Sequence, residues 1–115
     1  MLTALLLATW SQYEVTAYSK GCTMPKNGIE PEFNITASGA VPIANLTVAA
    51  DKSFPFGTRL LLSFEGILSP RTVQDRGGAI FGRRLDLYME NCQKARLWGR
   101  RKVWVRILEN GKAEE

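Results

Sequence analysis

Residues 74–88, with the sequence QDRGGAIFGRRLDLY, constrain the fold more than any other part of the chain. Fifteen positions hold two aspartates, three glycines and the start of an alternating polar and apolar run. Glycines permit positive φ or a close backbone approach, so the chain is expected to turn tightly here between extended pieces. Asp75 and Asp86 therefore lie beside turns, where catalytic groups commonly occur.

Other short alternating runs predict strands. They cover residues 14–18, 59–64, 72–74, 85–88 and 102–108. Turn signals separate them at 25–28, 38–39, 55–57, 65–66, 69–70 and 77–78. This spacing predicts a small closed β structure in a single domain of 115 residues and disfavours a βαβ sheet.

One short helix is predicted from about Asn91 to Trp98. The Asn91 side chain can cap its N-terminus, and Gly99 can end it. Ala95, Leu97 and Trp98 are expected to face the β structure.

The ordered motifs of this chain resemble the 3D domain, a family named for three aspartates. The pattern Gln-Asp-x-Gly-Gly-x-Ile-x-Gly-x-x-x-Asp-Leu-Tyr supplies Asp75 and Asp86, and Ala49-Ala50-Asp51 supplies the third. This domain occurs at the C-terminal end of membrane-bound lytic transglycosylase A and in muralytic proteins resembling stationary-phase survival and resuscitation-promoting factors. The resemblance runs from about residue 13 to 108 and includes 15–18, 35–39, 47–51, 55–58 and 99–103.

The resemblance implies an all-β fold, a small six-stranded double-psi β-barrel with one short helix. The barrel is expected to occupy residues 13–109, with an apolar segment at 1–12 and a frayed tail at 110–115. The apolar segment is too short to span a bilayer and lacks a basic n-region. It is interpreted either as the remainder of an export signal, which could tether the protein to the envelope, or as a strand or helix that packs on the domain.

The chain has no histidine, which removes Ser-His and Cys-His nucleophilic catalysis and most catalytic zinc sites. Carboxylates remain for acid–base work, and glycosidic-bond cleavage is a reaction for which carboxylates suffice. The family implies a peptidoglycan lytic transglycosylase, which cleaves the β-1,4 MurNAc-GlcNAc bond and leaves a 1,6-anhydro-MurNAc end. Neither a cofactor nor a metal is expected.

Asp86 is the predicted general acid/base, because it closes the motif at the family's proposed catalytic position. Its pKa should be raised so that it begins protonated. Asp75 and Asp51 are expected nearby, where their charges would raise that pKa. For all three, a structural role in holding a turn or loop is the alternative.

Further residues of the matching motifs are expected to line a glycan groove as hydroxyl and amide partners. They are Tyr18, Thr36, Ser38, Gly39, Gln74, Gly77 and Gly78. Arg83 and Arg84 are candidates for contact with the carboxylates of peptidoglycan, although exposed arginines are more often plain surface.

Charge is unevenly spread: residues 1–70 carry four Lys/Arg and five Asp/Glu, whereas residues 71–115 carry eleven and six. The basic half fits an anionic cell-wall polymer, anionic lipid or nucleic acid, and the alternative is a solvated face that keeps the protein soluble. A nucleic-acid face formed by Arg96, Arg100, Arg101, Lys102 and Arg106 with Trp98 and Trp104 is disfavoured, because no recognised nucleic-acid motif accompanies it. The main rival to the enzyme is a noncatalytic, expansin-like peptidoglycan-binding module; a hydrolase that activates water is a variant of the enzyme.

Cys22 and Cys92 are the only cysteines, and their spacing fits no zinc or Cys-x-x-Cys motif. In an exported protein they are expected to form a disulfide worth about 3 to 4 kcal/mol. The family implies a bacterial or phage-encoded protein of the cell envelope, or a secreted one.

Overall fold

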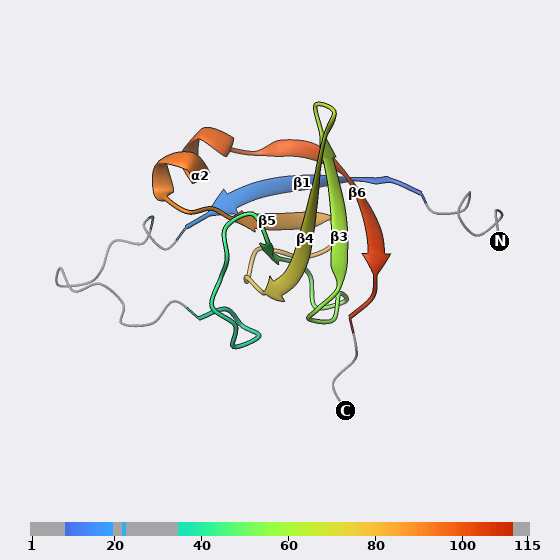
Figure 1. Ribbon diagram of the computed structural model, residues 1–115, viewed down its shortest axis with the longest axis horizontal. Coiled ribbons are helices and arrows are strands. Elements are labelled where there is room, and N and C mark those ends of the chain that lie inside the picture. Colours follow the sequence, from blue (N-terminus) through green and yellow to red (C-terminus); the bar gives the residue numbers. More distant parts are fainter. Residues whose placement is uncertain (1–8, 20–21, 23–34, 112–115) are drawn as a thin grey trace.

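The computed structural model describes residues 9–19, 22 and 35–111. Six strands close into a barrel in the order β1-β5-β2-β4-β3-β6. The elements are β1 (Ser11–Tyr18), β2 (Thr47–Ala49), β3 (Arg59–Phe64), β4 (Ile67–Asp75), β5 (Arg84–Tyr88), α2 (Cys92–Trp98) and β6 (Arg101–Glu109). Figure 1 shows the barrel with α2 at one end and the β3–β4 hairpin projecting beyond the other strands.

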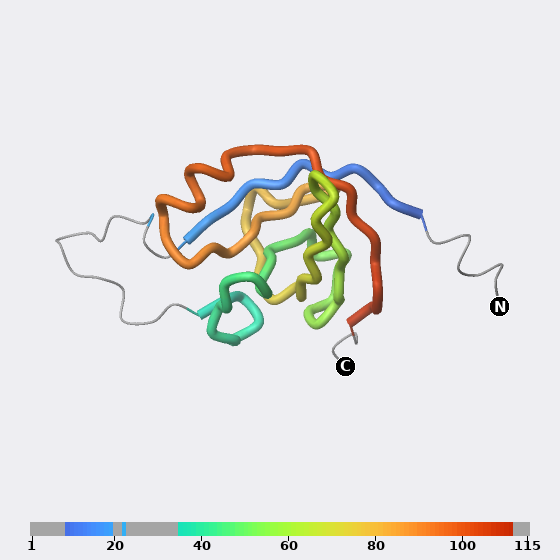
Figure 2. The backbone as a smooth tube through the Cα atoms, turned by 45° about the horizontal axis from the view of Figure 1, so that its top comes forward, coloured from blue at the N-terminus to red at the C-terminus, as the bar shows by residue number. Residues whose placement is uncertain are grey.

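The barrel is mixed. β1 pairs with β5, and β2 with β4, in parallel, while the remaining four neighbouring pairs are antiparallel. The tube in Figure 2 shows β1 and β6, from opposite ends of the chain, lying side by side. The six-stranded barrel with one short helix is thus confirmed.

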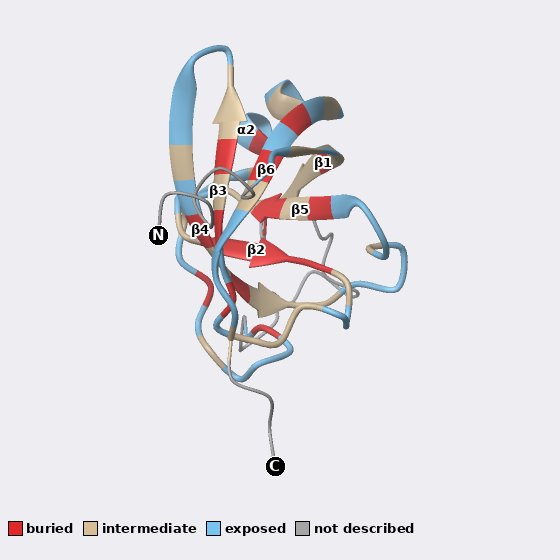
Figure 3. Ribbon diagram, turned by 90° about the vertical axis from the view of Figure 1, so that its right-hand side faces the viewer, coloured by how far each residue is buried: buried red, intermediate tan, exposed pale blue. Residues whose placement is uncertain are grey.

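Every strand contributes to the core. Side chains that are at least 97% buried come from all six strands: Val15, Val48, Leu60, Leu62, Val73, Leu85, Leu87, Val103 and Val105. Each stabilises the fold by roughly 2 kcal/mol when it leaves water. In Figure 3 the buried positions are red along the strands, and the tip of the β3–β4 hairpin is pale blue because its residues are exposed.

The five strands predicted from alternation are present; β3 has the predicted bounds, and the other four are longer than predicted. β2 is the strand that alternation did not reveal, because its three residues are all buried and give no period of two. The hairpin turn at Glu65 and Gly66 is confirmed, and both residues have positive φ. The turn predicted at 69–70 is wrong: Pro70 lies within β4 opposite Leu61 of β3, in a part of β4 with no second neighbouring strand, and sheets tolerate proline at such an edge.

The predicted helix is confirmed at both ends. Lys94 N–H donates to Asn91 Oδ1 at 2.9 Å, and Gly99 N–H donates to the Ala95 carbonyl oxygen at 3.2 Å. Ala95 and Trp98 face the barrel, but Leu97 does not and is 73% exposed. The reason is helical spacing, since residues three apart share a face and residues two apart do not.

Several expectations fall outside the described residues: the apolar segment over 1–8, the turn at 25–28 and the tail from 112. Gly111 is described, and its N–H donates to Thr58 Oγ1 at 2.9 Å. The chain is therefore held two residues beyond β6. No helix among the described ranges is long and apolar enough to cross a membrane.

Candidate functional site

The strand register sets a row of four residues across four strands. Thr16 on β1 lies opposite Asp86 on β5, Asp86 lies opposite Ala49 on β2, and Ala49 lies opposite Asp75 on β4. Because side chains alternate along β5, Leu85 and Leu87 enter the core and Asp86 points to the outer face. The two aspartates thus come from strands separated only by β2.

A β-bulge in β4 brings Asp75 into this row. Val48 pairs with Val73, yet the next residue of β2, Ala49, pairs with Asp75, so Gln74 is the extra residue. Bulges of this kind re-aim a side chain and are frequent beside functional sites. Gln74 itself is held by the buried Thr47, whose hydroxyl donates to Gln74 Oε1 at 2.6 Å.

The Asp86 side chain is half-buried, and its carboxyl group accepts a hydrogen bond from the neighbouring strand β1. Thr16 Oγ1 donates to Asp86 Oδ1 at 2.8 Å. Burial raises the pKa of the Asp86 carboxyl, the Thr16 hydrogen bond opposes this rise, and the charge of Asp75 adds to it. Asp86 is therefore easier to protonate than an ordinary aspartate.

Asp75 is held by three donors. Tyr18 Oη donates to Oδ2 at 2.6 Å, and the backbone N–H groups of Ala37 and Arg76 donate to Oδ1, each at 2.9 Å. Burial, followed by the hydrogen bond to Asp75, raises the pKa of Tyr18, so its phenol stays a donor. These donors stabilise a carboxylate at Asp75.

Asp51 follows β2 and lies outside the row of paired strand residues. Its Oδ2 accepts from Ser53 N–H at 3.1 Å, and hydrogen bonds to Ser53 lower its pKa. The charges of Asp51 and Asp75 both act on Arg76, but only that of Asp75 acts on Asp86. Asp51 therefore holds its own turn, beside a broad depression that it shares with Gly77 and Gly78.

The loop residues predicted to bind glycan mainly hold their own loop. Thr36 Oγ1 lies 2.9 Å from both Ser38 Oγ and the Ala40 carbonyl oxygen. Gly39 has a φ of 90°, and its N–H donates to the Thr36 carbonyl oxygen. Ser38 N–H in turn donates to the Gln74 carbonyl oxygen at 3.1 Å, which clips the loop to the end of β4.

Gly77 and Gly78 belong to the turn after β4 and, unlike Gly82, do not have positive φ. Ile80 N–H donates to the Gly77 carbonyl oxygen at 3.0 Å and closes this turn. A Cβ at Gly77 would lie 3.0 Å from Ile80 Cγ1, so the close approach expected there occurs at Gly77. Nothing approaches a Cβ built at Gly78 within 4 Å.

A depression of about 260 Å³ opens beside Asp86 and is lined by both charges and apolar groups. Arg84 and Arg100 border it, and Arg100 pairs with Glu14 at 2.8 Å. Arg84 lies over the Phe81 ring, with 4.8 Å from Cζ to the ring centroid. Arg83 does not line this depression; its carbonyl oxygen accepts from Glu14 N–H.

Sequence reasoning missed Thr16 as a site residue. It stands two positions before Tyr18 on β1, so both side chains share a face, and that spacing was the available signal. Two basic residues of the disfavoured nucleic-acid face make separate contacts within the protein. Arg101 stacks on Trp98, with 4.5 Å from Cζ to the ring centroid, while Arg100 pairs with Glu14. No metal-binding cluster of acids or cysteines occurs among the described residues.

The structure joins Cys22 and Cys92 in the predicted disulfide. The bond ties the chain after β1 to the first residue of α2, across a sequence separation of 70.

A family model of the 3D domain matches residues 46–109, which is more than half of the chain. The match contains Asp51, Asp75 and Asp86. No curated protein sequence matches the chain significantly.

Solved structures of lytic transglycosylases resemble this barrel. MltA from E. coli has a TM-score of 0.56 and 28% identity, over 70% of this chain and 29% of that chain. E. coli MltA with bound chitohexaose has a TM-score of 0.58 and 24% identity, over 69% of this chain and 28% of that chain. The membrane-bound lytic murein transglycosylase from Agrobacterium tumefaciens has a TM-score of 0.50 and 21% identity, over 65% of this chain and 25% of that chain. This match is a likeness of fold alone.

This chain thus spans less than a third of the length of those structures and is related to one part of MltA. With the family match over most of the barrel, and with the aspartate motif in place, the chain belongs to the 3D domain family.

Proposed function

We propose that this chain is a peptidoglycan lytic transglycosylase domain that cleaves the β-1,4 MurNAc-GlcNAc bond, with Asp86 as general acid and base. The observation that carries the proposal is the half-buried Asp86 carboxyl on the outer face, whose pKa is raised chiefly by burial. A carboxyl group whose pKa is raised holds its proton to a higher pH than an ordinary aspartate, and in that form it can protonate a leaving oxygen. The relation to part of MltA supports peptidoglycan as the substrate class.

In the proposed reaction, the Asp86 proton passes to the glycosidic oxygen as the bond to MurNAc C1 breaks. The 6-hydroxyl of the same MurNAc attacks C1, and its proton passes to the Asp86 carboxylate. The bond lost at C1 is replaced by the 1,6-anhydro bond, Asp86 ends protonated as it began, and no water is consumed. One carboxyl group therefore serves both steps.

Asp75 and Tyr18 would position and tune this acid. The Asp75 charge favours the protonated form of Asp86 and can stabilise positive charge that develops at C1. Tyr18 and the Ala37 N–H fix the Asp75 carboxylate. Thr16 keeps the Asp86 carboxyl aligned along β5. Asp51 and the glycines 77 and 78 would meet the glycan further along the same side of the molecule, in the adjoining depression.

A noncatalytic glycan-binding module is the second candidate. One observation favours it: the chain spans 29% of the length of MltA, so the rest of that protein has no counterpart in this sequence. The disulfide is consistent with action outside the reducing cytoplasm in either case, and we place the protein in the envelope or among secreted proteins.

The test is mass spectrometry of the soluble products released from peptidoglycan sacculi. We expect the unmodified protein to release anhydro-muropeptides and Asp86→Asn to release none. Glu90→Gln serves as a matched control, because Glu90 is an exposed carboxylate paired with Lys94 on the surface. Circular dichroism should show the same fold in all three.

Other products would redirect the proposal. Muropeptides with a reducing end would identify a hydrolase. Binding to sacculi with no released product would identify the noncatalytic module, and turnover by Asp86→Asn would refute the role of that residue.

A further inference from the structure

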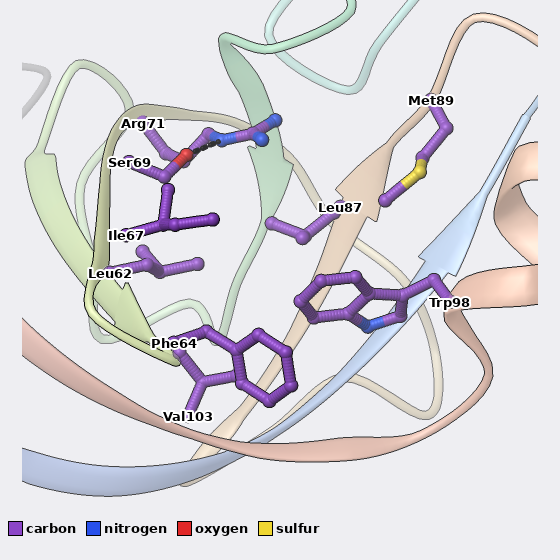
Figure 4. Close-up of a pocket in the computed structure, with 9 residues that line it drawn as sticks. All are labelled: Leu62, Phe64, Ile67, Ser69, Arg71, Leu87, Met89, Trp98 and Val103. Atoms are coloured by element: carbon purple, nitrogen blue, oxygen red, sulfur yellow. Dashed lines mark hydrogen bonds between the residues drawn. The ribbon is translucent and has the colours of Figure 1, made fainter.

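A second hollow lies on the inner side of the barrel wall, away from the candidate glycan site. It has a volume of about 170 Å³ and a mainly apolar lining that includes Leu62, Phe64, Leu87, Met89, Trp98 and Val103 (Figure 4). Leu87 follows Asp86 along β5 and points to the opposite face, so the two hollows share no lining residue. Ile67, another lining residue, is 69% exposed, so the hollow reaches the surface beside the β3–β4 hairpin.

Arg71 is the cation among the lining residues, while Arg101 stacks on the Phe64 and Trp98 rings without lining the hollow itself. Arg71 is only 8% exposed, and Figure 4 shows its guanidinium extending above Leu87. Its Nε donates to Ser69 Oγ at 2.9 Å, while its Nη1 is buried and has no acceptor among the residues that the structure describes. No carboxylate of the described ranges forms an ion pair with it.

This arrangement is costly for the empty protein. The Nη1 donor of the Arg71 guanidinium has been removed from water without a replacement acceptor among the described residues, and a buried donor of this kind destabilises the fold. Burial lowers the pKa of Arg71, but arginine remains charged in proteins. An anion that enters the hollow would supply the missing acceptor and the missing charge.

The apolar lining and the volume define that anion. Phosphate and other strongly hydrated anions would lose their water against Leu87, Met89 and Trp98, and these apolar side chains offer no hydrogen bonds in exchange. A carboxylate carries one charge, matches the guanidinium in shape and can be attached to an apolar body. A dry cavity of about 150 Å³ holds one benzene molecule, so this hollow suits a body of about six carbons.

We propose that this hollow, hereafter the Arg71 pocket, is a binding site for a monocarboxylate with a small apolar body, anchored by Arg71. The site is independent of the glycan-cleaving function proposed above, because it lies on the other side of the barrel wall. A free short-chain acid and the C-terminal residue of a peptide both present this chemistry.

The first test is an NMR titration of the full chain with hexanoate and with uncharged hexanamide. We expect saturable shifts at the Trp98 indole and at the amides of Leu87 and Val103, with hexanoate binding about tenfold tighter than hexanamide. N-acetylleucine and its amide form the peptide arm and should show the same preference if a peptide terminus is the ligand. Binding of either acid supports the proposal.

Three results would overturn it: no saturable binding of either acid, equal affinity for acids and amides, or shifts centred on Arg84 and Asp86. A pair of variants adds a second test. Arg71→Met should lose about tenfold in hexanoate affinity and keep its hexanamide affinity. Arg106→Met is the matched control, since Arg106 also has a buried unpaired nitrogen but lies outside the pocket, and it should bind hexanoate as the unmodified protein does.

A loss of hexanoate affinity in both variants, or in neither, would contradict the proposal. If Arg71→Met fails to fold, the preference of the unmodified protein for acid over amide decides the matter alone.

Discussion

The three aspartates of the family motif differ in what surrounds each carboxyl. Asp75 accepts three hydrogen bonds, and Asp51 holds a turn next to Ser53. Asp86 is half-buried, accepts a hydrogen bond from Thr16 and feels the charge of Asp75. The carboxyl groups of Asp75 and Asp86 therefore differ in their hydrogen bonds, and the pKa of Asp86 is raised chiefly by burial. Different environments of this kind allow two carboxyl groups to take different parts in acid catalysis.

Removal of the Asp86 charge should change stability in a pH-dependent way. Its folded pKa is raised, so the folded state binds this proton more tightly than the unfolded state does, and stability from this group falls as pH rises above the ordinary aspartate pKa of about 3.9. We expect Asp86→Asn to raise Tm at pH 7 and to leave it nearly unchanged at pH 3, where both states are protonated.

The Tm of the variant and of the unmodified protein is measured at the two pH values by thermal unfolding, with circular dichroism as the probe. Asn Oδ1 can still accept from Thr16, so that hydrogen bond is retained. A variant that is less stable than the unmodified protein at pH 7 would show that ionised Asp86 is stabilised in the fold.

Tyr18→Phe isolates the hydroxyl that holds Asp75. The change should lower the free energy of unfolding by about 1 kcal/mol, the usual net value of one hydrogen bond. If Asp75 assists Asp86, release of anhydro-muropeptides should also slow by about tenfold, as expected when a carboxylate loses its alignment. Tyr13→Phe removes another partly buried phenol and should leave the rate unchanged; equal rates for the two variants would exclude a role for Tyr18.

At the scale of elements, the site depends on how loops and strand ends are attached to the barrel. The bulge at Gln74 brings Asp75 opposite Ala49, and the loop at 36–39 is clipped to the same strand end by Ala37 and Ser38. At the far end of β6, Gly111 lies against the turn at Phe56 and Thr58. Such attachments leave little freedom to the segments that frame the aspartates.

Gly111→Ala should weaken the last of these attachments. An added Cβ would lie 2.7 Å from Thr58 N and closer still to the Phe56 carbonyl oxygen, both of them backbone atoms. We expect a loss of about 1 to 3 kcal/mol in the free energy of unfolding, typical of overpacking. Urea denaturation measures it, with Gly78→Ala as control because nothing lies within 4 Å of a Cβ there. Equal midpoints for the two variants would mean that the end of β6 detaches easily.

At the scale of the whole molecule, a closed barrel is tied by one disulfide and carries different hollows on the two sides of its wall. The Asp86 depression lies on the outer face, and the Arg71 pocket lies on the inner face under the β3–β4 hairpin. The region that this chain shares with MltA covers 29% of the MltA chain.

Loss of the disulfide should act mainly on the unfolded chain. A crosslink across a sequence separation of 70 is worth about 4 kcal/mol in the chain-entropy treatment. We expect the double variant Cys22→Ser and Cys92→Ser to lose about that amount in urea denaturation. Dithiothreitol should destabilise the unmodified protein equally and leave the variant unaffected; a variant as stable as the oxidised protein would contradict this expectation.

The sequence by itself determined the features that depend on neighbours along the chain. The Asn91 and Gly99 caps, the Glu65–Gly66 turn and most strands follow from local residue chemistry, and the absence of histidine limits the catalytic groups. The aspartate motif identified the family, and the family implied the six-stranded barrel.

Only the tertiary structure decided which distant residues meet. Asp86 and Asp75 flank Ala49 because three strands from separate parts of the chain pair in one register, with a bulge that no local pattern marks. Arg71 reads as an ordinary basic residue in the sequence, yet closure of the barrel buries it against an apolar hollow. Burial and strand register are properties of non-local packing, so the environment of each charged group, and with it the chemistry, was fixed only when the barrel closed.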